Sequence, residues 1–141
     1  MRELRTPFLS VDMILHTRKT EIILIERCNA PYGIALPGGF VDIGEDLIDA
    51  AKRETLEEVS CTTLFLRQFQ AYGHPSRDPR FHSCSVVFYG QVKEIPRAND
   101  DAKRIILYDI HQPLPELQFD HNQILSDYLG QILPHIQEQL I

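Results

Sequence analysis

The chain of 141 residues lacks the features that mark several specialised protein classes. Its cysteines, Cys28, Cys61 and Cys84, are odd in number and show no CxxC spacing, which argues against a disulfide framework or a zinc knuckle. Such cysteine usage favours a reducing, cytoplasmic setting. The six histidines form neither an HExxH motif nor a regular ligand spacing, so we interpret them as ordinary surface or core residues.

Long apolar segments and an excess of positive charge are also absent. No stretch approaches the ~18–20 apolar residues of a membrane helix, and residues 1–7 lack the apolar run of a signal peptide. The formal net charge of −6 argues against a nucleic-acid or membrane-surface binder, because such proteins are basic. We therefore expect the protein to bind neither nucleic acid nor a membrane. The negative charge still permits a phosphorylated small substrate if cations bridge it to the protein.

What is present fits one globular domain, which we predict over residues 1–141. Hydrophobic residues make up 43% of the chain, enough for a sizeable core, and no repeat or low-complexity tract divides it. Apolar runs predict strands over residues 8–15, 21–26, 62–72, 83–92 and 105–108, and a short strand leading into a glycine turn at 35–39. Helical spacing predicts helices over 46–59 and from Asp120, with Asp120 as N-cap. This order favours an α/β fold in which helices cover a mixed sheet.

The most informative segment carries acidic residues at fixed spacing behind a glycine. It comprises Gly39, Glu45, Arg53, Glu54, Glu57 and Glu58. Because a helix repeats every 3.6 residues, the last three glutamates share one face, which we expect to point outward. Like charges this close repel each other. Mg²⁺ or Mn²⁺ is the strongest candidate to compensate them, since hard carboxylate oxygens suit these ions.

Each part of this segment has a chemical use. Glycine lets the backbone approach a ligand closely, and a helix that begins after such a turn can present its N-terminus to phosphate. A divalent ion would polarise a phosphoryl oxygen, and Arg53 can pair with a ligand glutamate and fix its orientation. The alternative is a common, solvated acidic helix face. Six matched positions, each with a frequency of roughly 6%, occur by chance on the order of once in 10⁷ starting points, which disfavours it.

Residues 39–61 resemble the Nudix box, Gx5Ex7REUxEExGU, in which U is aliphatic. All six residues of the segment above match it. Thr55 and Cys61 replace aliphatic residues, and Ser60 replaces the final glycine that normally closes the helix in a left-handed conformation. We therefore expect the helix end to be strained or capped differently. None of the three departures touches a proposed metal ligand.

The resemblance implies an α/β/α sandwich and hydrolysis of a nucleoside diphosphate linked to another moiety. The implied metal ligands are the carbonyl of Gly38 and the carboxylates of Glu54, Glu57 and Glu58, with Mg²⁺ as the ion and Mn²⁺ as the alternative. Glu45 is implied to add charge near the site or to pair with Arg53. Family members differ in their general base. The candidates here are Glu57, which we favour, Glu54, and the loop pair Asp100 and Asp101.

Residues 74–80 bear on the substrate. The order Arg77-Asp78-Pro79-Arg80 can aim two guanidinium groups at phosphate or ribose, although an ordinary charged surface loop has the same composition. The segment resembles the corresponding loop of short microbial ADP-ribose pyrophosphatases. Weaker matches to that group follow in the same order at Thr6, Pro7 and Asp12 and at residues 25–27, 36–41, 101–103 and 119–121.

This second resemblance implies conversion of ADP-ribose to AMP and ribose 5-phosphate by a homodimer. The substrate-binding candidates are Arg27, Arg77, Arg80 and Gly39. Aromatic residues such as Phe81, Phe119 and Tyr108 can stack on adenine, but are more often core residues.

Two alternatives stay open. One is another Nudix substrate, such as 8-oxo-dGTP, NADH or a dinucleoside polyphosphate, which the box does not distinguish. The other is a non-catalytic nucleotide-binding sensor. Some Nudix-like regulators carry an added DNA-binding domain, for which we expect no room after the last predicted helix.

Overall fold

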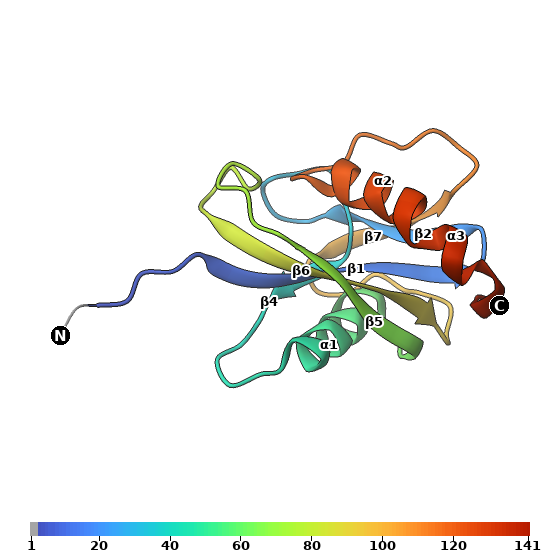
Figure 1. Cartoon of the computed structure of the whole chain (residues 1–141), viewed down its shortest axis with the longest axis horizontal. Coiled ribbons are helices and arrows are strands. Elements are labelled where there is room, and N and C mark those ends of the chain that lie inside the picture. Colours follow the sequence, from blue (N-terminus) through green and yellow to red (C-terminus); the bar gives the residue numbers. More distant parts are fainter. Residues whose placement is uncertain (1–2) are drawn as a thin grey trace.

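The computed structural model describes residues 3–141, and a mixed sheet of seven strands forms its centre (Figure 1). The strands are β1 (Phe8–Arg18), β2 (Glu21–Arg27), β3 (Ile34–Ala35), β4 (Gly38–Phe40), β5 (Thr63–Tyr72), β6 (Ser83–Val92) and β7 (Ala102–Asp109). Their order is β3-β2-β1-β6-β5, with β4 also beside β1 and β7 beside β2. β1 and β6 run parallel, and the other pairs are antiparallel. Residues 1 and 2 lie outside the described range. The predictions of one domain over residues 1–141 and of no signal peptide in residues 1–7 both include them.

Helices cover both faces of the sheet. They are α1 (Leu47–Val59), α2 (His121–Gln131), α3 (Leu133–Ile136) and the 3-10 turn η1 (Gln137–Gln139). Figure 1 shows α1 against one face and α2 with α3 against the other. The predicted α/β/α arrangement around a mixed sheet is therefore confirmed. Within residues 3–141, no helix combines the length and apolar character that a membrane crossing requires.

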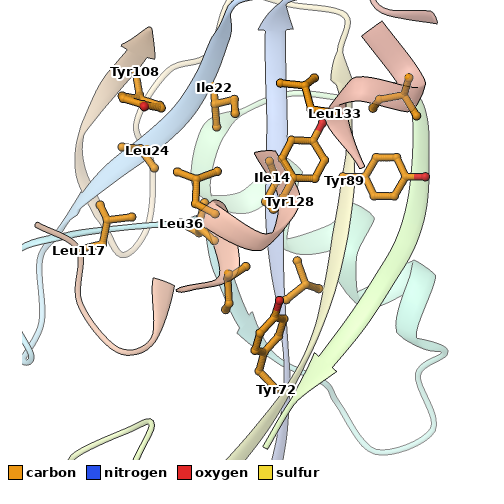
Figure 2. Close-up of a cluster of buried hydrophobic side chains, with 14 of the residues drawn as sticks. Ile14, Ile22, Leu24, Leu36, Tyr72, Tyr89, Tyr108, Leu117, Tyr128 and Leu133 are labelled. Carbon is orange, nitrogen blue, oxygen red and sulfur yellow. The ribbon is translucent and has the colours of Figure 1, made fainter. Parts of the chain in front are cut away.

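The core follows from alternation along the strands, because successive side chains point to opposite faces. In β1, Val11 and Met13 are fully buried in the cluster under α1, which includes Ala50. Ile14 belongs to the cluster on the other face, where it packs with Tyr128 of α2 (Figure 2). Both faces are apolar, so the sheet is stabilised by burial on two sides.

Most predicted elements appear with shifted ends, but the predicted glycine turn is wrong. Gly38 and Gly39 lie in strand β4, in register with Asp12 and Val11 of β1. β1 pairs with β2 only near their connecting turn, at His16 and at Arg18. The beginning of β1 is therefore available to β4, and this pairing draws the glycines into the sheet beneath α1.

Candidate active site

The glutamates of α1 divide into a buried pair and an exposed member. Glu54 is 9% and Glu58 4% exposed, whereas the side chain of Glu57 is 43% exposed. The expectation that the whole face points outward is therefore wrong for two of the three. The reason is the glycine strand: the Gly38 N–H donates to Glu58 Oε2 at 3.1 Å, and a Cβ on Gly39 would lie 2.3 Å from the Glu54 carboxylate.

One guanidinium ties the acidic residues together. Arg53 donates from Nε and Nη2 to Glu45 at 2.7 and 2.9 Å. Its Nη1 donates to Glu54 at 2.8 Å and to Glu57 at 3.1 Å, and its Nη2 reaches the Phe40 carbonyl at 3.0 Å. Hydrogen bonds from Arg53 lower the pKa of Glu45 to about 2. Arg53 thus fixes the orientation of two predicted metal ligands.

Negative charge is nevertheless in excess here. Burial, followed by the charges of Glu54, Asp101 and Asp12, raises the pKa of Glu58 to about 8. Burial also raises the pKa of Glu54. Carboxylates that resist ionisation for these reasons fit a hard divalent cation in charge and in donor type.

The carboxylates are not assembled into a complete ligand shell. In the part of the chain described here, no three His, Cys, Asp or Glu side chains are placed to hold a metal ion as they stand. Arg53 Nη1 instead bonds both Glu54 and Glu57. The predicted ligand set therefore stays a prediction.

A cavity of about 320 Å³ extends from Glu54 and Glu58 across the end of the sheet. Its acidic lining residues are Asp12, Asp42, Glu54, Glu58, Asp78 and Asp101, and its basic ones are Arg27, Arg53, Arg77 and Arg80. The structure thus brings the predicted arginines and three of the four predicted metal ligands, Gly38, Glu54 and Glu58, into one cavity, whereas Glu57 does not line it. Residues 46–49, at the start of α1, do not line it, so a phosphate in this cavity would lie away from that helix N-terminus.

We call the part of the cavity lined by Glu54 and Glu58 the acidic wall, and the part lined by Arg27, Arg80 and Phe119 the basic wall. The basic wall contains two guanidinium groups around an aromatic ring. The Cζ atoms of Arg27 and Arg80 lie 5.0 and 5.6 Å from the ring centroid of Phe119. Burial, and then the charge of Arg80, lowers the pKa of Arg27. Phe119 has φ 57°, a left-handed conformation that costs about 1–3 kcal/mol in a non-glycine residue and clusters at functional sites. This wall therefore carries positive charge that an anion would stabilise.

Arg77 lines the same cavity but is bound within the protein. Its Nε and Nη2 atoms donate to Asp120 at 2.9 and 2.8 Å, and Nη1 donates to Ser83 Oγ at 2.9 Å. Asp120 precedes α2 as predicted, but its side chain makes no capping hydrogen bond, because the carboxylate binds Arg77 instead. Most of the donors of Arg77 are thus occupied by protein groups.

The sequence did not predict Asp12 and His121 as residues of the site. In the structure Asp12 is a buried acid, and His121 lies beside it. His121 Nε2 lies 3.5 Å from Asp12 Oδ1, while Nδ1 accepts a hydrogen bond from the Leu36 N–H at 3.0 Å. Burial would raise the pKa of Asp12, but His121, Ser85 and then Arg77 hold it below its usual value. The one sequence feature that could have indicated Asp12 is its position as an acidic residue inside the otherwise apolar run of β1. This network links the start of α2 to the segment that leads into Gly38.

The remaining predicted residues occupy different positions. Asp101 lines the cavity and accepts a hydrogen bond from Asn29 Nδ2 at 2.9 Å, whereas Asp100 does not line it. Tyr108 is a core residue whose hydroxyl donates to the Gln112 carbonyl at 2.6 Å. Ser60 does close α1 in the left-handed conformation, at φ 61°.

The sandwich and its glutamate-lined cavity define the class of protein. A family model described as the NUDIX domain matches residues 6–128, so the chain belongs to the Nudix hydrolase family. Members of this family generally use divalent metal ions. The family predicted from the box is confirmed.

Relatives within the family include two proteins named for ADP-ribose. The chain is 39% identical over 130 residues to the ADP-ribose pyrophosphatase of Methanocaldococcus jannaschii, which covers 87% of this chain and 73% of that protein. It is 30% identical over 137 residues to the ADPR responsive transcriptional repressor NtrR of Acinetobacter baylyi, over 90% of this chain. The chain spans 55% of that repressor's length.

Solved structures show the same fold. A MutT/nudix family protein from Enterococcus faecalis superposes with a TM-score of 0.84 at 26% identity, covering 96% of this chain and 66% of that one. The NUDIX domain of Shewanella oneidensis NrtR, solved with ADP ribose, gives a TM-score of 0.78 at 23% identity over 92% of this chain and 90% of its own. At that identity, the second likeness concerns the fold.

Proposed function

We propose that the chain hydrolyses the pyrophosphate bond of ADP-ribose, or of a similar nucleoside diphosphate sugar, to AMP and ribose 5-phosphate. The observation that carries this proposal is one cavity with buried glutamates on one wall and two arginines around Phe119 on the other. A diphosphate linked to two ribose groups matches both walls. The relative from M. jannaschii, named as an ADP-ribose pyrophosphatase, supports the same substrate.

The acidic wall is proposed to perform the chemistry. The proposed ligands of Mg²⁺, or alternatively Mn²⁺, are the carbonyl of Gly38 and the carboxylates of Glu54, Glu57 and Glu58. When bound, the ion would polarise a phosphoryl oxygen and lower the pKa of a coordinated water. The residues fit it because Glu54 and Glu58 are buried with raised pKa values and a shared negative excess.

Arg53 and the general base complete this wall. Arg53 orients Glu54 and Glu57 through its Nη1 atom. We propose Glu57 as the base, because it is the most exposed of the three glutamates and can meet a water; Glu54 and the loop acid Asp101 are the alternatives. Measured pH–rate profiles of Glu57→Gln and Asp101→Asn separate these choices. At saturating Mg²⁺, the base is the residue whose loss lowers kcat and removes the acidic limb of the profile; for Glu57, which is also a proposed ligand, metal affinity falls as well.

The basic wall is proposed to hold the substrate. Arg27 and Arg80 line the cavity, and neither is saturated: Arg27 donates from Nε to the Pro31 carbonyl, and Arg80 pairs with Asp78. Each has a further nitrogen available to phosphate or ribose oxygens. Arg77 is proposed to contribute by orienting this wall through Asp120, and Gly39 by the close backbone approach that it permits.

A substrate panel tests the reaction. ADP-ribose, 8-oxo-dGTP, NADH and a dinucleoside polyphosphate are supplied at equal concentration with Mg²⁺, and the products are identified by chromatography. We expect AMP and ribose 5-phosphate from ADP-ribose at the highest kcat/KM. A strong preference for 8-oxo-dGTP would overturn the assignment of the substrate but not that of the metal site.

A second candidate function is sensing of ADP-ribose without hydrolysis. The observation that favours it is the 30% identity to a repressor named as ADPR responsive. Calorimetry that shows tight binding of ADP-ribose, together with no AMP release in Mg²⁺ or Mn²⁺, would select it. The intact glutamates of α1 favour the enzyme.

We also propose that the protein is a cytoplasmic homodimer. Cys28, Cys61 and Cys84 are all free, which supports a reducing compartment. Sedimentation analysis checks the dimer, and a monomer at working concentration would exclude it.

A further inference from the structure

The backbone of Gly38 points away from its neighbouring strand. β4 pairs with β1 so that Gly38 lies opposite Asp12, and the Met13 N–H donates to the Pro37 carbonyl at 2.9 Å. Opposed residues of an antiparallel pair alternate between hydrogen-bonded and non-hydrogen-bonded positions, so Gly38 occupies a non-hydrogen-bonded one. Its N–H donates instead to Glu58. The pairing therefore directs both polar backbone groups of Gly38 away from β1, and contacts outside β1 must hold them in place.

The link between β3 and β4 is held by His121. This link consists of Leu36 and Pro37, and the buried Leu36 N–H donates to His121 Nδ1 at 3.0 Å. The Leu36 side chain is 2% exposed and belongs to the buried cluster that includes Tyr128 (Figure 2). Proline has a fixed φ and restricts the residue before it, so the link is stiff. A shift of Leu36 would therefore be passed on to Gly38, two residues further along.

The imidazole of His121 is itself fixed by its surroundings. The residue is 2% exposed, and the Phe119 ring lies against it with the ring centroids 5.1 Å apart. Because Nδ1 accepts from Leu36, Nε2 is left to face Asp12 Oδ1, at 3.5 Å. That oxygen would lie 2.3 Å from a Cβ on Gly38. His121 thus contacts both the chain that leads into Gly38 and the side chain packed against it.

We infer that His121 is a positioning residue for the metal site, because through Leu36 it holds the segment that presents the Gly38 carbonyl as a ligand. This inference rests on the proposed function, in which Gly38, Glu54 and Glu58 bind the cation. Groups that orient a metal ligand change the affinity for the metal although they do not touch it. The metal site would then depend on α2 as well as on α1.

Binding of Mn²⁺ to the metal-free protein tests this role, and electron paramagnetic resonance of free Mn²⁺ measures it without turnover. For His121→Ala we expect the dissociation constant of Mn²⁺ to rise about tenfold, the lower end of the range for partners of metal ligands, because His121 acts through Leu36 and Pro37. The Mg²⁺ concentration that gives half-maximal hydrolysis should rise by a similar factor.

Two conservative variants separate the contacts of the imidazole. Asparagine keeps an acceptor near the position of Nδ1 for the Leu36 N–H, whereas glutamine reaches the position of Nε2 and keeps a donor toward Asp12. We expect His121→Asn to bind Mn²⁺ nearly as tightly as the wild type, and His121→Gln to bind it as weakly as His121→Ala. The reverse order would overturn the assigned route through Leu36.

His16 supplies the matched control, because it is a second buried histidine in contact with α2. It is fully buried, its Nε2 lies 2.6 Å from the Tyr128 hydroxyl, and it does not line the cavity. His16→Ala should lower the free energy of unfolding, as His121→Ala does, but leave the dissociation constant of Mn²⁺ unchanged. An equal loss of Mn²⁺ affinity in both variants would show general loosening of the fold and overturn the inference.

The same titration distinguishes failure of this inference from failure of the proposed function. If the wild type binds Mn²⁺ and His121→Ala binds it equally well, the inference is wrong and the metal site stands. If the wild type binds no Mn²⁺, the proposed metal site and this inference are both wrong.

Discussion

The two walls of the cavity are built in opposite ways. The proposed metal ligands of the acidic wall come from one continuous stretch, in which β4 and α1 bring Gly38, Glu54 and Glu58 together. The basic wall is assembled from separated segments that carry Arg27, the 77–80 loop and Phe119. The first has an excess of negative charge around one internal arginine, and the second has two like-charged guanidinium groups beside one ring.

This difference assigns separate tasks to the walls. A locally encoded wall keeps its internal geometry through one helix and one strand, which suits chemistry that depends on small displacements. A wall made of distant loops can vary without disturbing the first, which suits selection of the substrate. Changes in the acidic wall should therefore lower kcat, and changes in the basic wall should raise KM.

The strongest test of the acidic wall is Glu58→Gln, with Glu57→Gln beside it. We expect kcat for ADP-ribose to fall by more than about a hundredfold, because changing even a partner of a metal ligand typically costs about 10–100-fold. Circular dichroism and a thermal melt of each variant confirm folding. Full activity in both variants would remove the metal assignment.

Arg53→Lys tests the single cation of that wall. Lysine keeps the charge but not the fork that bonds Glu45 twice and Glu54 and Glu57 once each. We expect kcat/KM to fall about 10–100-fold, with a weaker response to added Mg²⁺. Lys52→Arg on the same helix is the control. Equal activity of Arg53→Lys and the wild type would show that charge alone suffices.

The basic wall is tested by Arg27→Ala and Arg80→Ala. Each is expected to raise KM about tenfold, since a hydrogen bond to a charged group contributes about 1.5–3 kcal/mol, and to leave kcat nearly unchanged. Arg104→Ala is the matched control, because Arg104 pairs with Glu26 and neither residue lines the cavity. A fall in kcat with constant KM would contradict the division of tasks.

The link between the walls is tested by His121→Ala. Removing the imidazole leaves the buried Leu36 N–H without its acceptor and leaves Asp12 with only Ser85 and Arg77 beside it. We expect a loss of about 1–3 kcal/mol in the free energy of unfolding, measured in urea. His121→Asn, which retains an acceptor, should lose less. Equal losses would show that packing, not this hydrogen bond, stabilises the link.

The last test concerns pH in metal-free protein. Burial raises the pKa of Glu58 from 4.5 to about 8, so between these values the folded state binds more protons than the unfolded chain. Stability therefore falls as pH rises through this window. Thermal melts in EDTA at about pH 5 and about pH 8 measure the fall, which should shrink in Glu58→Gln. An equal fall in the variant would assign it to other groups.

The acidic wall was largely predictable because its spacing is local. The interval from Glu54 to Glu58 is set by the helix, and pairing with Arg53 was one of the two roles that the box implied for Glu45. The sequence did not reveal that Glu54 and Glu58 are buried, since that depends on the pairing of β4 with β1. A turn and a strand are equally compatible with two glycines.

The basic wall was predictable only in part because its contacts are long-range. Arg77 was expected at the substrate, yet its carboxylate partner Asp120 lies 43 residues away and was expected to cap a helix. The ring of Phe119 reaches Arg27 across most of the chain. No local pattern encodes such pairs, and the resemblance to known enzymes supplied only the order of the segments.

The bare Cα of Gly39 has a consequence for how this chain can change over generations. A methyl group there would meet the Glu54 carboxylate at 2.3 Å, so each position restricts the other. The carboxylate is the far end of a flexible side chain, so a side chain at position 39 would displace it from its place beside Arg53 rather than distort the backbone. Loss of the glycine is therefore expected to disturb a proposed metal ligand before it disturbs the fold, and a shorter acid at position 54 would relieve that contact.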